Sequence, residues 1–126
     1  MKILKREDGA ALVEFALVVM LLLMIVFSII EFGRIFHAQL VVTHAAREGA
    51  RVGVVTNSAN RDSQAVSTAV SRGASISLAG SNVSTSTSGD QFTVTVNYAV
   101  DILTPIMSGI ITDPLPITGS AVMRIE

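Results

Sequence analysis

A glutamate at the start of an apolar run is the first residue of this sequence that could carry specific chemistry. Glu14 follows the stretch Gly9 to Val13, and the run from Phe15 to Ile30 behind it contains no charged residue. A charged carboxylate costs about 2.5 to 3.5 kcal/mol at the centre of a membrane helix, and less near its end. Two interpretations fit this position. Either the acid reaches the lipid headgroups or is protonated, or a partner charge from outside the chain pairs with it.

Two histidines on the following segment are candidate metal ligands. His44 and Glu48 are four residues apart, and His37 shares their face of a helix, so the group could hold zinc. The chain has no cysteine and no HExxH pattern, and no further ligand is within certain reach. We therefore expect solvated residues and no metal site, and keep a metal-dependent or hydrolytic protein using His37 and His44 as the less favoured alternative.

Arg47, Glu48 and Arg51 form a charged group within the stretch AAREGAR. On a helix such residues form ion pairs worth a few tenths of a kcal/mol each. Glu31 and Arg34, nearer the N-terminus of the same predicted helix, could form another such pair. The alternative is that the charged group contacts another subunit. The sequence has no GxSxG, no P-loop and no paired acids at a recognisable spacing, so we expect no enzyme and no cofactor.

The element that must position Glu14 is a membrane helix. Half of the 126 residues are hydrophobic and the mean hydropathy is +0.60. A helix over residues 10–30 is about 31 Å long, which matches the hydrocarbon thickness of a bilayer. A cleavable signal has a shorter apolar region and a small-residue cleavage site behind it, whereas here EFGR continues the helical pattern. The sequence predicts one membrane span.

The flanking charges predict the orientation of this span. Lys2, Lys5 and Arg6 lie on its short N-terminal side, so the positive-inside tendency places the N-terminus in the cytoplasm and the C-terminal part outside. The net charge of -1 and the lack of a basic cluster with aromatics exclude nucleic acid as an expected partner.

Beyond the span, residues 31–56 predict an amphipathic continuation of the same helix. Its small apolar stripe comprises Ile35, Val42, Ala46, Gly49 and Gly53. The three glycines at positions 33, 49 and 53 would allow another backbone to approach closely. The helix should end near residues 56–58, and Asn60 is the candidate cap of a second helix over residues 61–72, which Gly73 ends.

The rest of the chain predicts a small sheet. Residues 73–90 are rich in Ser, Thr and Gly and predict a mobile loop with a strand near residues 83–87. Residues 91–100 alternate apolar and polar side chains as a half-buried strand does, and residues 117–125 predict the last strand. Residues 57–126 are too few for a core of their own, so this module must pack on the apolar stripe of the long helix. The predicted fold is α+β: a long N-terminal helix with a short helix and about three antiparallel strands.

The N-terminal third of the chain resembles a known family. The stretch Gly9 to Phe15 looks like the processing site of type IV prepilins, with a glycine before the scissile bond and a glutamate as fifth mature residue. More narrowly, residues 7–54, including EFGR and AAREGAR, are similar to the TadE-like family of tight-adherence (Flp) pilus systems. This resemblance implies a pilin-like architecture.

The resemblance also implies a function. A prepilin peptidase would cut between Gly9 and Ala10 and remove the leader of residues 1–9. Glu14, followed by Phe15 at the aromatic position of the motif, would pair with the free amine of a neighbouring subunit. The expected protein is a minor pilin or pseudopilin that helps to initiate or cap the filament. Its partners would be inner-membrane lipid, the peptidase, other pilin-like subunits and the assembly machinery, and the alternative is an unprocessed single-span binding module.

Overall fold

The computed structural model describes the backbone of residues 2–126 and the side chains of residues 7–126. The side chains of Lys2, Lys5 and Arg6, on which the predicted orientation depends, lie outside the described residues. The elements in chain order are α1 (Lys2–Val55), α2 (Arg61–Arg72), the 3-10 turns η1 (Ala74–Ile76) and η2 (Gly80–Asn82), β1 (Val83–Ser88), β2 (Gln91–Val100), α3 (Pro105–Ser108) and β3 (Leu115–Arg124).

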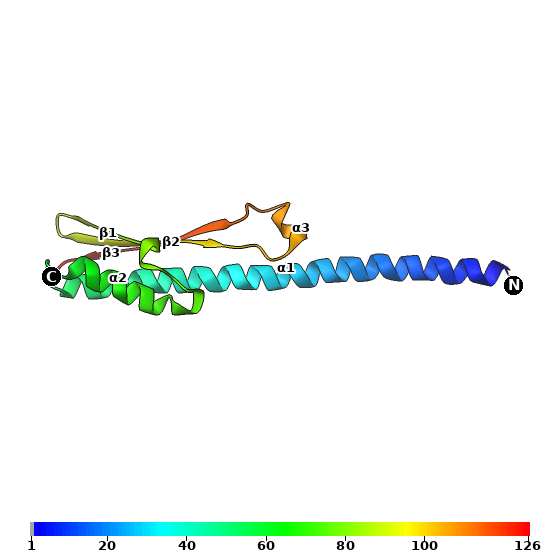
Figure 1. Cartoon of the computed structure of the whole chain (residues 1–126), viewed down its shortest axis with the longest axis horizontal. Coiled ribbons are helices and arrows are strands. Elements are labelled where there is room, and N and C mark those ends of the chain that lie inside the picture. Colours follow the sequence, from blue (N-terminus) through cyan, green and yellow to red (C-terminus); the bar gives the residue numbers. More distant parts are fainter. Residues whose placement is uncertain (1) are drawn as a thin grey trace.

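One helix, α1, runs through the whole length of the molecule (Figure 1). All other elements lie along its C-terminal half, and its N-terminal half projects alone. The helix is unbroken for 54 residues, which agrees with the lack of proline before Pro105. The predicted α+β fold, with a long apolar helix, a short helix and an antiparallel sheet, is confirmed.

The sheet is antiparallel with the order β1-β2-β3, so the predicted central strand lies between the other two. Val94 of β2 is paired with Thr85 on one side and with Ala121 on the other. A turn at Gly89, whose φ is +61°, joins β1 to β2 and suits a residue without a Cβ. The period-two alternation of β2 places Phe92, Val94 and Val96 in the core, where all three are fully buried.

The core lies between this sheet, α2 and the outer half of α1. The stripe predicted on α1 is buried here, with Val42 and Ala46 fully covered. Small residues on α1 bring the other elements close to its axis. At Gly49 an added Cβ would lie 2.9 Å from the carbonyl oxygen of Ala65 in α2, and at Gly53 it would overlap the ring of Phe92. The predicted close approach is confirmed at Gly49, where the neighbour is backbone.

Two local predictions need correction. Asn60 occupies the position before α2, but its side chain does not cap the helix; instead Asn57 Oδ1 accepts a hydrogen bond from the Asn60 N–H over 3.1 Å. The segment predicted as a loop contains the predicted strand and also η1 and η2. Leu78, between the two turns, is 5% exposed and belongs to the core, and this burial holds the segment against the helices.

Candidate functional site

The N-terminal half of α1 exposes its apolar side chains in every direction. Phe15 is 67% exposed, Leu22 56% and Ile30 54%, values that are high for large apolar side chains. Within the described residues, α1 is long and apolar enough to cross a membrane, judged by length and composition. Such a surface requires an apolar surrounding that the chain itself does not supply.

Gly9 and Ala10, the predicted cleavage site, lie within this exposed part of α1. The helix passes through both residues without a break. An added Cβ at Gly9 would meet nothing within 4 Å, in contrast to Gly49 and Gly53. Packing within the described chain therefore gives no reason for a glycine at position 9, and a requirement for it would have to come from a partner.

Glu14 and Phe15 are also exposed. Among residues 7–126, no cation lies within ion-pair distance of Glu14. The carboxylate thus lies at the start of the apolar run without a counter-charge from the described part of the chain. A charge in such a place is costly unless something outside supplies a partner or the lipid headgroups solvate it.

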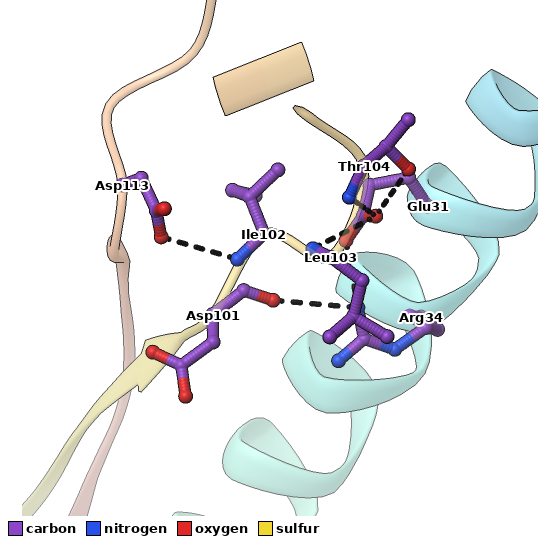
Figure 2. Close-up of polar contacts among 7 residues, drawn as sticks. All are labelled: Glu31, Arg34, Asp101, Ile102, Leu103, Thr104 and Asp113. Carbon is purple, nitrogen blue, oxygen red and sulfur yellow. Dashed lines mark hydrogen bonds and ion pairs between the residues drawn. The ribbon is translucent and has the colours of Figure 1, made fainter. Parts of the chain in front are cut away.

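The opposite end of the apolar run carries a second acid, Glu31, and this one is buried (Figure 2). Its Oε2 accepts hydrogen bonds from the backbone N–H groups of Leu103 at 3.2 Å and Thr104 at 3.3 Å. The Thr104 hydroxyl donates to the same oxygen over 2.9 Å. Its other oxygen, Oε1, accepts from Arg34 Nη1 at 2.7 Å. A fully partnered carboxylate of this kind tolerates burial.

Glu31 and Arg34 together fix the segment that follows β2 onto α1. Arg34 also donates to the carbonyl oxygen of Asp101 over 3.3 Å, and Asp113 accepts the N–H of Ile102 over 3.2 Å (Figure 2). The ion pair between Glu31 and Arg34 was predicted, but the burial of Glu31 was not. The sequence signal was an acid directly after an apolar run; the backbone donors that it binds have no signature in the sequence.

In the charged group of Arg47, Glu48 and Arg51, only Glu48 pairs with a residue of α2. Glu48 Oε2 accepts from Arg51 Nη2 at 3.0 Å and lies 4.0 Å from Arg72 of α2. The hydrogen bond from Arg51 lowers the pKa of Glu48, although burial acts in the opposite direction. Arg47 and Arg51 are exposed, so their guanidinium groups remain accessible to another molecule.

His37 and His44 are both exposed on α1. Over the described part of the chain, no three His, Cys, Asp or Glu side chains come together in a way that could hold a metal ion. The charge of His44 contributes, after Arg51 and Arg72, to lowering the pKa of Glu48. Both histidines therefore belong to the exposed charged surface of α1.

Residues 9–51 match the family model described as TadE-like protein, so the resemblance carried by these residues is confirmed. The match over residues 9–51 suggests a pilin-like protein associated with a Tad pilus, and the long apolar helix suggests membrane anchoring. No curated protein and no solved structure matches the chain.

Proposed function

We propose that this chain is a minor pilin or pseudopilin of a tight-adherence (Flp) pilus, and that it helps to initiate or cap the filament. A prepilin peptidase removes residues 1–9 by cutting between Gly9 and Ala10. Residues 10–30 anchor the chain in the bacterial inner membrane, with the N-terminus in the cytoplasm and residues 57–126 outside. The chain acts as a structural and assembly subunit and carries out no catalysis.

The observation that carries this proposal is the position of Glu14. It is an exposed acid in an apolar surface, and no cation among residues 7–126 pairs with it. Cleavage after Gly9 would create a cationic amine on Ala10. The amine of a neighbouring subunit would offset the cost of desolvating Glu14, provided that the two groups are close, and the pair would set the register between subunits. Phe15 supplies apolar contact beside the pair.

Two other features support an assembly role. A Cβ at position 9 would meet nothing within 4 Å in the described part of the chain, which fits a glycine required by a peptidase. The charged group at Arg47, Glu48 and Arg51 leaves two arginines exposed on the outer half of α1, where they can meet an acidic patch of another subunit. Other pilin-like subunits and the assembly machinery are therefore the proposed partners, together with membrane lipid.

The first test is the intact mass and N-terminal sequence of the protein from its native host, with and without the prepilin peptidase. We expect a chain that begins at Ala10 only when the peptidase is present. A chain that begins at Met1 in both strains would contradict the proposal and leave an unprocessed single-span membrane protein with a binding module outside.

Variants separate processing from assembly. Gly9→Leu should abolish cleavage, and the matched variant Gly33→Leu, at another glycine with nothing within 4 Å, should be cleaved normally. Glu14→Ala should be cleaved normally but should lower the amount of protein recovered with filaments by about tenfold, the effect of losing about 1.4 kcal/mol in a subunit contact. Normal filament incorporation of both Gly9→Leu and Glu14→Ala would overturn the proposal.

A further inference from the structure

The segment between β2 and β3 carries an exposed apolar surface that the proposed function does not use. Residues 102–111, here called the apolar loop, contain no charged residue and include α3. Leu103 is 69% exposed, Ile110 72% and Ile106 43%, whereas Met107 is buried. Large apolar side chains at the tip of a loop indicate a contact with something outside the chain.

The apolar loop lies beside the end of the predicted membrane span. In Figure 1, α3 extends away from the sheet and back along α1 toward its N-terminal half. Ser28 Oγ lies 3.7 Å from Met107 Sδ, and Glu31 accepts a hydrogen bond from the Thr104 hydroxyl. Since the span ends at Ile30, the contact with Ser28 lies about 3 Å inside that end at 1.5 Å per residue. The loop is therefore level with the boundary between acyl chains and headgroups.

Most backbone N–H groups of the apolar loop are hydrogen-bonded within the molecule, the exception being that of Ile106 in the first turn of α3. Glu31 accepts the N–H groups of Leu103 and Thr104, and Asp113 accepts that of Ile102. Carbonyl oxygens of the loop accept further N–H groups, namely those of Met107, Ser108, Gly109, Ile110 and Ile111. Pro105 has no N–H to satisfy. A segment whose side chains are apolar outside and most of whose backbone donors are paired inside enters a low-dielectric surrounding at a lower cost than an unpaired segment does.

A groove between the apolar loop and α1 continues the lipid-facing surface. It has a volume of about 410 Å³, and its walls include Phe27 and Ile30 from α1 and Leu103 and Ile106 from the loop. Phe27 and Ile30 are two of the exposed apolar side chains of α1, and Glu31 and Arg34 line the groove beside them. The surface that faces lipid along the span therefore extends onto the loop.

We propose that the apolar loop is a second membrane contact, which inserts Leu103, Ile106 and Ile110 into the outer headgroup and acyl-chain boundary beside the span. Acyl chains fill the groove against Phe27. This inference rests on the membrane placement of α1 in the proposed function. Glu31 and Arg34 hold the loop at this depth, so the outer module lies on the membrane surface at a fixed height.

The test uses the full chain in lipid vesicles. Because the sequence has no cysteine, single-cysteine variants can each carry one environment-sensitive fluorophore. The probes are Ile110→Cys and Leu103→Cys in the loop, with Leu22→Cys as the reference in the span. Val122→Cys on β3 is the matched control, since Val122 is an exposed apolar residue, 57% accessible, in the far part of the module. Vesicles contain phosphatidylcholine with a nitroxide near the top of one acyl chain.

We expect the nitroxide lipid to quench both loop probes and the span probe at least about threefold more than the Val122 probe. Quenching at Leu22 with loop probes no different from Val122 would overturn this inference and leave the proposed function standing. Absence of quenching at Leu22 would refute the membrane placement and the inference together. Shielding of the loop probes that rises with protein density, without quenching by lipid, would mean that a second copy covers the loop and would also overturn the inference.

Discussion

The two halves of α1 are continuous as a helix but differ in what surrounds them. In the half before Glu31 large apolar side chains are exposed, whereas the half from Glu31 onward is packed against α2 and the sheet. The glycines differ along the helix: an added Cβ would meet nothing within 4 Å at Gly9 in the first half or at Gly33 just after Glu31, whereas at Gly49 and Gly53 it would meet close neighbours. In the outer half, packing within the chain explains the buried residues, although large apolar side chains such as that of Phe36 are exposed there as well. In the inner half, lipid or partner subunits must explain it.

Substitution of the two acids at the ends of the apolar run tests this comparison with the largest expected effect. Glu31→Ala removes the acceptor of the Leu103 and Thr104 N–H groups and leaves Arg34 without its partner. The loss should be about 3 kcal/mol, or about 100-fold faster hydrogen exchange at the two amides. Hydrogen exchange of the full chain in detergent micelles measures this effect.

Glu14→Ala is the control for that experiment. Because Glu14 has no ion-pair partner among residues 7–126, exchange at Leu103 and Thr104 should stay as in the wild type. If Glu31→Ala leaves the two amides as protected as before, the carboxylate does not hold the apolar loop on α1.

The glycines give a second test, with effects of opposite sign at a packed position and at an open position of α1. Gly53→Ala should destabilise the outer module by about 2 kcal/mol, because the new methyl group overlaps the buried ring of Phe92. Denaturant unfolding followed by the fluorescence of Tyr98, the one tyrosine in the chain, measures the change.

Gly33→Ala is the matched variant, since its methyl group meets nothing within 4 Å. Removing a glycine from a helix interior should raise helix stability by up to about 1 kcal/mol. The comparison would be broken if both substitutions changed the unfolding free energy in the same direction.

The smallest expected effect concerns Glu48, where α1 meets α2. The hydrogen bond from Arg51 lowers the pKa of Glu48 below its ordinary value of 4.5. Its contribution to stability is therefore present above that ordinary pKa and is lost as the pH falls through the lower pKa of the folded state. The difference in unfolding midpoint between the wild type and Glu48→Gln should be measurable at about pH 7 and smaller at about pH 3, which is below the ordinary pKa.

Glu14→Gln serves as the reference in the other half, and its midpoint should follow that of the wild type at both pH values. A difference between wild type and Glu48→Gln that is equally large at the lower pH would show that the charge of Glu48 is not the cause.

Most of the fold follows from periodicity and turn residues. The bounds predicted for α2, residues 61–72, and for β2, residues 91–100, agree with the structure. Gly73 after α2 and the Ser-Gly-Asp turn at residues 88–90 before β2 are strong local signals of where these elements end and begin. The apolar stripe of α1 was predictable since small residues recur at helical spacing. These features depend on neighbours in the sequence, which is why the sequence reveals them.

What could not be predicted depends on contacts between distant segments. Glu31 binds backbone N–H groups more than seventy positions later, and any residue type other than proline offers such a donor. The path of the apolar loop back along α1 was equally hidden, because Pro105 and Gly109 indicate only where regular structure stops. For the processing and pairing residues Gly9, Ala10, Glu14 and Phe15, the fold leaves the sequence-based prediction as it was, since their proposed partners lie outside the chain.

The exposure of the inner half of α1 on all sides also limits the routes by which the helix can move out of the bilayer. Each large apolar side chain costs about 1.5 to 3 kcal/mol in water relative to an apolar surrounding, and the positions from Leu12 to Ile30 carry many of them. No water-soluble intermediate is accessible at that cost. In the proposed membrane placement, the helix leaves the bilayer only sideways, with lipid replaced by another apolar surface at every step.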